Sequence, residues 1–198
     1  MTIVKYYDAT RADELLADVV RLLREARPSV RAVNWFADDV GTPELKDVRS
    51  RYFAELLADD AHADYRRVLQ VDINGIPSEL HVQSLHGKYD HLYLAHFADM
   101  IQKYEVSSSS RKVELSASRA RFPTTFVILD DLAVVVELNQ LDQFASADIT
   151  RWRTTGALLI LNPAREVVDG FNRMFEALYA DSCPVTSSAD PINDTARV

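Results

Sequence analysis

The chain has 198 residues, which is long enough for one globular domain. Of these residues 47% are hydrophobic, 26% charged and 9% aromatic, and this composition excludes a disordered chain. A net charge of -8 repels polyphosphate and anionic lipid, and no apolar run reaches the roughly 20 residues of a membrane span, so we expect neither direct nucleic-acid binding nor membrane binding. The single cysteine, Cys183, excludes an internal disulfide framework and a Cys-based zinc cluster, and we predict a cytoplasmic protein without a cofactor.

The first half of the chain alternates predicted helices with predicted strands. Apolar spacing and turn residues predict a helix at 10–26, a strand at 29–35, a helix at 43–57, a strand at 65–71 and a helix at 89–104. The segment 72–87 stays open, because Asn74-Gly75 is typical of a hairpin turn while the later apolar residues suit a strand or an irregular loop. This alternation favours parallel strands joined by helical crossovers.

Strands dominate the second half of the chain. The predicted elements are a strand at 112–116, two strands at 124–129 and 132–138, a strand at 157–161 and an amphipathic helix at 163–178. Asp130-Asp131 predicts a tight hairpin turn, which requires local antiparallel pairing. We therefore predict an α/β fold with a mixed sheet flanked by helices on both faces. It forms one domain at 1–183, followed by a polar, flexible C-terminal tail at 184–198.

Two stretches of sequence carry a family resemblance over most of residues 10–184. FVILDDLAVVVELNQ, GALLILNPAREVVDGFNRMFEALYADSCP and the order of elements resemble the phospholipase D superfamily, in particular a single-lobe member. In that superfamily a strand carries an HxK motif, an aspartate follows at the hairpin turn, and a GSxN-like segment lies on the returning strand. The resemblance implies the same fold for this chain.

The catalytic part of the superfamily pattern is degenerate in this sequence. Aligning the hairpin places Pro123 at the histidine position and Thr125 at the lysine position, keeps Asp130, and replaces the GSxN segment by residues 137–140. In the superfamily the histidine attacks phosphorus and the lysine neutralises phosphate charge, so both functions need side chains that are missing here. The resemblance therefore implies the fold and argues against the activity.

A former catalytic cleft could still bind a ligand. The candidate residues there are Thr125, Asp130, Glu137, Asn139, Arg119, Arg121 and Trp35. An arginine at the cleft mouth would hold a phosphate or carboxylate through a forked contact, which makes a small anionic ligand the expected one. Trp35 follows Asn34 at the end of a predicted strand, where open α/β sheets bind ligands. Alternatively, the arginines are exposed loop charges, the aspartates are turn residues and Trp35 is core.

The histidines do not form a convincing site. His86-Gly-Lys88 is a second HxK, but its segment is predicted to enter a helix instead of a strand, and we interpret it as a chance match. His91 and His96 are five residues apart, which places them about 140° apart around a helix and prevents both from binding one metal. A metal held by His86, Asp90 and His91 is the alternative, and we predict no metal site.

Two classes of function remain open from the sequence. The leading hypothesis is a catalytically inactive phospholipase D-like domain, a pseudoenzyme that acts as a ligand-binding or regulatory module and forms a homodimer across its apolar cleft face. The competing hypothesis is an enzyme of altered chemistry that acts on a small phosphate-bearing or nucleotide-like substrate in the same cleft. A partner domain for a separate DNA-binding protein is a third interpretation that fits the acidic charge.

Overall fold

The computed structural model describes residues 1–35, 43–58, 64–70, 80–81, 96, 98–103, 112–118, 124–142 and 151–186. Its strands are β1 (Ile3–Asp8), β2 (Val30–Trp35), β3 (Asp64–Gln70), β4 (Leu80–His81), β5 (Lys112–Ser118), β6 (Thr125–Leu129), β7 (Ala133–Asp142), β8 (Arg151–Leu161) and β9 (Ser182–Thr186). Within the described residues they form one sheet in the order β1-β8-β7-β6-β2-β3-β5-β9-β4. The pairs β2–β3, β3–β5 and β4–β9 are parallel and the others antiparallel, so the sheet is mixed, as predicted.

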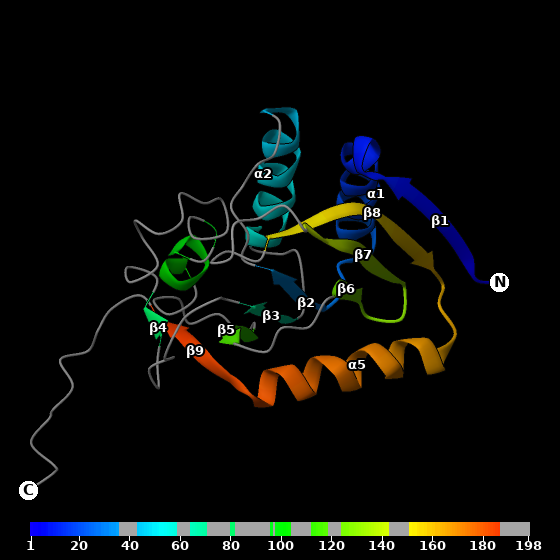
Figure 1. The fold of residues 1–198 in the computed structure, drawn as a ribbon. Coiled ribbons are helices and arrows are strands. Elements are labelled where there is room, and N and C mark those ends of the chain that lie inside the picture. Colours follow the sequence, from blue (N-terminus) through cyan, green and yellow to red (C-terminus); the bar gives the residue numbers. More distant parts are fainter. Residues whose placement is uncertain are drawn as a thin grey trace, which may run out of the picture.

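Helices cover both faces of this sheet, which confirms the predicted layers (Figure 1). The helices α1 (Ala12–Ala26) and α2 (Pro43–Leu57) lie on one face, and α5 (Arg165–Ala180) lies on the other. Each interface between helices and sheet has its own apolar cluster, and the alternation of side chains along the strands separates the two. The α1/α2 side includes Leu23 and Leu129, and the α5 side includes Phe126 and Phe175.

The predicted helix at 10–26 is observed as a short 3-10 turn, η1 (Ala9–Arg11), followed by α1. The Asp8 carboxylate accepts a hydrogen bond from the Thr10 amide at 2.9 Å and caps this start. The helix ends at Arg27, whose φ of 50° is left-handed and whose amide donates to the Leu23 carbonyl. Pro28 follows immediately, so the chain turns into β2 at the predicted place.

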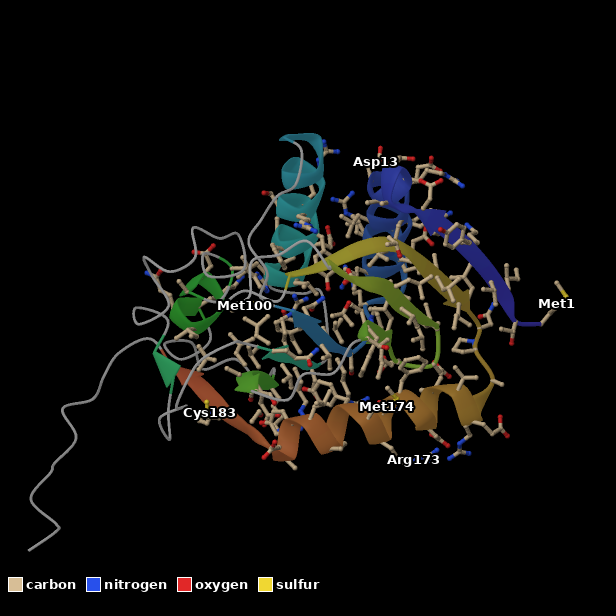
Figure 2. The ribbon with its side chains drawn as sticks, in the orientation of Figure 1. Met1, Asp13, Met100, Arg173, Met174 and Cys183 are labelled. Carbon is tan, nitrogen blue, oxygen red and sulfur yellow. The ribbon has the colours of Figure 1, made fainter. Side chains whose placement is uncertain are left out.

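The helix α5 packs one apolar stripe against the sheet. Val168, Phe175 and Leu178 are buried, and their spacing of three to seven residues keeps them on one face of the helix. Figure 2 labels two neighbours on this helix, of which Met174 packs against the apolar cluster and Arg173 is exposed. The helix begins at Arg165, two residues after the predicted start at Pro163.

An arginine on the same face of the sheet fixes α5 in place. Arg66 in β3 forms ion pairs with Glu114 in β5 and Glu176 in α5, both at 2.6 Å. Its guanidinium also lies 4.2 Å from the ring centroid of Tyr179 and 5.0 Å from that of Phe175. Arg66 therefore joins two strands to the helix through charge and ring contacts together.

The hairpin between β6 and β7 is confirmed. The register Leu129↔Ala133 leaves the three residues 130–132 as the turn, and Asp130 has a φ of 45°. Aspartate tolerates this left-handed conformation better than most residues. The hairpin continues into a longer pair than predicted, because β7 extends to Asp142 and β8 begins at Arg151.

Two strands were not predicted from the sequence. β1 pairs antiparallel with β8 at one end of the sheet, and β9 pairs antiparallel with β5 near the other end. β9 runs to Thr186, so the first three residues of the predicted tail are part of the sheet, and 187–198 lie outside the described residues. The predicted helix at 89–104 is described only at residues 96 and 98–103, which are helical. No described helix is both long and apolar enough to cross a membrane.

Candidate ligand-binding cavity

A row of four polar residues crosses the sheet beneath α1 and α2. Arg67 in β3 pairs with Ala32, which lies two residues before Asn34 in β2. Asn34 lies beside Thr125 in β6, because the antiparallel register pairs Val33 with Phe126. Thr125 in turn pairs with Glu137 in β7. Since β3, β2, β6 and β7 are consecutive in the sheet, these side chains form one continuous polar line on an otherwise apolar face.

Arg67 is the most unusual member of this row, because only 1% of the residue is exposed. Its Nη2 donates a hydrogen bond to the Tyr52 hydroxyl at 2.9 Å. The guanidinium carbon lies 5.8, 5.5 and 5.5 Å from the ring centroids of Tyr52, Phe53 and Tyr65. Aromatic faces attract a cation and compensate in part for its lost hydration. The fold therefore holds a permanent positive charge inside the α1/α2 interface.

The other three members of the row differ in how their polar atoms are used. The Thr125 hydroxyl, on a residue 1% exposed, donates a short hydrogen bond to Glu137 Oε2. Asn34 is 4% exposed, and its side-chain oxygen has no hydrogen-bond partner among the residues that the structure describes. A buried amide oxygen without a partner is costly, so a ligand that donates a hydrogen bond there would be stabilising.

A cavity of about 210 Å³ lies between this row and the two helices. Its walls come from η1, α1, α2 and the strands, and the residues lining it are Tyr7, Asp8, Ala9, Ala12, Leu15, Leu16, Val19, Asn34, Arg49, Tyr52, Phe53, Arg67, Val127, Val135, Glu137, Gly156 and Ala157. Mostly apolar walls with a few polar groups are typical of small-molecule sites. At about 30 Å³ per water, the space corresponds to roughly seven waters, so it suits a small ligand and not a lipid or a polynucleotide.

Asp130 lies at the opposite end of β6 from Thr125. The two residues are five positions apart along an extended strand, which corresponds to about 16 Å. The Asp130 carboxylate accepts a hydrogen bond from the Ser29 amide at 2.8 Å, and the Asp130 amide donates to the Ser29 carbonyl at 3.2 Å. Asp130 therefore ties the hairpin to the start of β2, and the structure does not bring it together with the cavity residues.

The remaining candidate residues divide by whether the structure describes them. Glu137 lines the cavity and accepts a hydrogen bond from the Thr125 hydroxyl, so these two residues are brought together. Trp35 and Asn139 are placed by their backbones alone, at the end of β2 and within β7. Arg119, Arg121 and Pro123 lie outside the described residues, as do His86, Lys88, Asp90 and His91.

Sequence reasoning missed Arg67 and Tyr52. Arg67 stands between Tyr65 and Leu69 at alternate positions of a predicted strand, which places it on the same side as two core residues. An arginine at such a position predicts a buried cation, so this signal was present in the sequence. Tyr52 was predicted as an apolar position of its helix, and its hydroxyl contact with Arg67 depends on how α2 meets the sheet.

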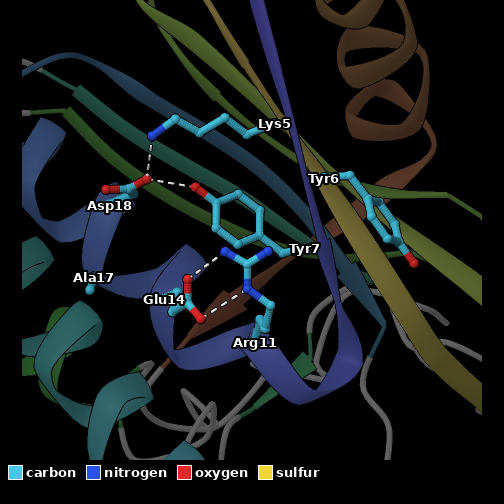
Figure 3. A pocket seen from close by; sticks show the side chains of 7 residues that line it. All are labelled: Lys5, Tyr6, Tyr7, Arg11, Glu14, Ala17 and Asp18. Atoms are coloured by element: carbon cyan, nitrogen blue, oxygen red, sulfur yellow. Dashed lines mark hydrogen bonds and ion pairs between the residues drawn. The ribbon is translucent and has the colours of Figure 1, made fainter.

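A second, more open groove lies between β1 and α1 (Figure 3). There the Asp18 carboxylate accepts hydrogen bonds from Lys5 Nζ at 2.8 Å and from the Tyr7 hydroxyl at 2.6 Å. Burial and the hydrogen bond to Asp18 both raise the pKa of Tyr7. Burial raises the pKa of Asp18, but its hydrogen bonds from Lys5 and Tyr7 outweigh this effect and lower it.

The polar side chains of this groove are mostly engaged with one another. Arg11 forms a bidentate pair with Glu14 at 2.9 and 2.5 Å, and Arg21 binds the other Asp18 oxygen at 2.8 Å. Tyr6 points to the opposite side of β1 in Figure 3. This network attaches β1 to α1, and we place the candidate site in the cavity that contains Asn34 and Arg67. In the part of the chain with described coordinates, no group of three or more His, Cys, Asp or Glu side chains is arranged to hold a metal.

The fold of this chain is similar to that of a solved phospholipase D family member. Nuc from Salmonella typhimurium, a phospholipase D family member, aligns with a TM-score of 0.54 and 11% sequence identity, over 94% of this chain and all of Nuc. NucT from Helicobacter pylori aligns with a TM-score of 0.47 and 14% identity, over 93% of this chain and 99% of NucT. No protein-family model and no curated protein sequence matches the chain. The chain therefore has a phospholipase D-like α/β fold, over nearly its whole length.

Proposed function

We propose that this chain is a catalytically inactive phospholipase D-like domain that binds a small anionic ligand in the cavity beneath α1 and α2. The observation that carries the proposal is the buried guanidinium of Arg67, which lines a cavity of limited volume. A fixed cation in such a space attracts a carboxylate or phosphate strongly, because the surrounding apolar walls screen the charge poorly. Binding of the anion would link α2 to the sheet, and a ligand-dependent change in the position of α2 is how the domain would regulate a partner.

The loss of catalysis follows from what occupies the reactive positions. Thr125 stands where the resemblance places the cationic lysine, and its hydroxyl is hydrogen-bonded to Glu137. A neutral hydroxyl beside a carboxylate offers no positive charge for a phosphoryl transition state. The described histidine side chain, His96, stacks on Phe53 at 4.3 Å and does not line the cavity. Proline at 123 has no nucleophilic nitrogen.

One observation favours the alternative of an enzyme with altered chemistry. The hydroxyl of Thr125 donates directly to the carboxylate of Glu137, and a hydroxyl next to a base is the arrangement of an activated nucleophile. Such an enzyme would act on a small phosphate-bearing or nucleotide-like substrate, which the cavity volume would limit in size. The two proposals differ in the comparison of the native chain with Thr125→Val: the enzyme predicts turnover that the substitution abolishes, and the inactive domain predicts no turnover by either protein.

The proposal includes self-association with a second copy of the chain. The exposed large apolar side chains of the described residues are Met1, Ile3, Val4 and Tyr6 in and beside β1, at the edge of the sheet, and Leu138 of β7 two strands further in, which favours this edge over the cleft face that the sequence suggested. This apolar surface supports a contact between copies at the β1 edge. Light scattering at micromolar concentration tests it: we expect a dimer, and a monomer for both the native chain and Tyr6→Glu would contradict this part.

The binding test uses two adjacent arginines as a matched pair. Arg67 faces the cavity and Arg66 faces α5, so Arg67→Met should remove binding of butyrate and inorganic phosphate while Arg66→Met keeps it. Calorimetric titration measures binding, and circular dichroism confirms that each variant is folded. Arg67→Lys retains the charge and should retain part of the affinity if Arg67→Met fails to fold. Equal binding by folded Arg67→Met and the native chain would contradict the proposal.

The turnover test uses methyl 4-nitrophenyl phosphate as the phosphodiester, because the cavity of about 210 Å³ admits only a small substrate. We expect the native chain and Thr125→Val to show the same rate as buffer. Hydrolysis by the native chain that Thr125→Val or Glu137→Gln abolishes would establish the enzyme alternative and refute the inactive domain. Asp130→Ala is the control, because this residue lies at the other end of β6 and supports the turn.

A further inference from the structure

The acidic side chains around the cavity lie at one end of it and the basic side chains at the other. Asp8 and Glu137 line it from β1 and β7, which are two strands apart in the sheet, with Gly156 of the intervening strand β8 also in the wall. Hydrogen bonds from the Thr10 hydroxyl and amide lower the pKa of Asp8, which keeps this carboxylate negative at neutral pH. The acidic end of the cavity therefore lies over the β1-β8-β7 part of the sheet.

The basic end lies on the other side of the same cavity. Arg67 comes from β3 and Arg49 from α2, and both line the space. β3 is three strands away from β7, so the backbones that carry Arg67 and Glu137 are separated by about 14 Å across the sheet. Two long side chains occupy part of this separation, and the remaining volume of about 210 Å³ is that of a molecule of few heavy atoms.

Between the two ends of the cavity lie two hydrogen-bond acceptors that a donor group of a ligand would satisfy. The Asn34 side-chain oxygen is an acceptor with no partner in the described part of the chain. The only hydrogen bond that the described residues give Glu137 is the one Thr125 donates to Oε2, so its other carboxylate oxygen is a further acceptor. A simple anion such as phosphate monoester or acetate pairs with the arginines but leaves these acceptors unsatisfied. A ligand with an ammonium or similar donor group would satisfy both.

We infer that the cavity takes a small zwitterion, with its anionic group at Arg67 and its ammonium group between Glu137 and Asn34. This inference rests on the proposed function, since it places the anion at the same arginine. It adds the second pole of the ligand, which excludes plain carboxylates and phosphates as the preferred ligands. Specificity comes from the acidic end, because an anion without a donor leaves the half-buried Glu137 carboxylate and the buried Asn34 oxygen uncompensated.

The test compares three probes of nearly equal length. 4-Aminobutyrate carries both charges, butyrate carries only the anion, and 1-aminobutane carries only the cation. By calorimetric or NMR titration we expect 4-aminobutyrate to bind the native chain at least tenfold more tightly than either of the others, equivalent to about 1.4 kcal/mol. Glu137→Gln keeps an oxygen that can accept from Thr125, and it should reduce the preference for 4-aminobutyrate over butyrate to less than about threefold.

The outcomes separate this inference from the proposed function. Equal affinity for butyrate and 4-aminobutyrate would overturn the zwitterion and leave the anion site intact. No binding of either anion to the folded native chain would overturn both. Tighter binding of 1-aminobutane than of 4-aminobutyrate would overturn the zwitterion, because the carboxylate of the ligand would then add nothing to its affinity. An unchanged preference in folded Glu137→Gln would show that the donor is not held at Glu137 and would overturn the assignment.

Discussion

Gly156 is the position where a single methyl group should disturb the packing most clearly. A Cβ built there would lie 2.8 Å from the Tyr7 carbonyl oxygen, 2.8 Å from the Tyr6 hydroxyl and 2.9 Å from Tyr6 Cε2. The Tyr6 ring is more than half exposed and can move, but the Tyr7 carbonyl belongs to β1, which pairs with β8 along its whole length. Relief therefore requires a displacement of the β1 backbone. Gly156 pairs with Leu138 of β7 and lies next to the register shift between Leu138 and Asn139. Glycine is common at such irregular positions in strands.

The expected magnitude follows from two opposing effects. Overpacking costs about 1–3 kcal/mol, and the reduced freedom of the unfolded chain with alanine returns about 0.4–1 kcal/mol. We expect Gly156→Ala to lower the free energy of unfolding by about 1–2 kcal/mol, which lowers Tm by about 2–8 °C in a chain of this size. Thermal unfolding followed by circular dichroism measures the change.

Gly170 supplies the matched control within the same protein. It lies inside α5, and a Cβ there would meet nothing within 4 Å. Gly170→Ala should therefore stabilise the protein by about 0.5–1 kcal/mol, because alanine favours the helix and costs no packing. If Gly156→Ala is as stable as Gly170→Ala, the close approach of β1 to β8 is wrong and the reasoning is refuted.

Two further variants test the hairpin and the α5 contacts. Asp130→Ala should lower the free energy of unfolding in urea by about 2 kcal/mol, because it removes a charged acceptor from the Ser29 amide and places alanine at a φ of 45°. Asp130→Asn should cost less than half of that. Equal stability of Asp130→Ala and the native chain would contradict this role. Burial raises the pKa of Glu114, but hydrogen bonds from Lys112 and its other partners outweigh this and lower it. The stabilising effect of Glu114 is thus complete above its ordinary pKa of 4.5 and is lost as the pH falls through the lower folded value, so the urea midpoint should fall in that range and Glu114→Gln should flatten the fall. An unchanged slope in Glu114→Gln would assign the pH dependence to other groups.

Much of the architecture could be predicted because its elements carry strong local patterns. α1 and α5 show apolar residues at helical spacing with polar residues opposite, and the hairpin combines two β-branched runs with an aspartate pair. Each of these features depends on residues that are near one another in sequence. The alternation of helices and strands then predicted the parallel β2–β3–β5 core of the sheet.

The two missed strands lack such patterns for physical reasons. In β1 large side chains point to both faces, and Tyr7 is its only buried residue, so the sequence shows no alternation of apolar and polar positions. In β9 the proline at 184 indicates a break, yet it is accommodated opposite Ser116 of β5. The partners of both strands are more than 60 residues away in sequence, and only the tertiary fold brings them together.

The candidate site was predicted in part. Thr125 and Glu137 were identified through the hairpin alignment, and the register places them side by side. The same alignment also grouped Asp130 with them, although the length of one strand separates it from the cavity. The alternation of Tyr65, Arg67 and Leu69 was an overlooked signal that Arg67 is buried, whereas its aromatic partners from α2 and the cavity beneath that helix depend on the tertiary fold.

The most direct test of the account is to locate the bound anion by NMR. Titrating butyrate and then 4-aminobutyrate into isotope-labelled protein should shift the amide resonances of Asn34, Arg67, Gly156 and Ala157, which surround the cavity, while those of α5 stay unchanged. The same titration of Arg67→Met should give no shifts. Saturable shifts confined to the groove around Lys5, Tyr7 and Asp18, or to α5, would contradict the assignment of the ligand site to the cavity beneath α1 and α2.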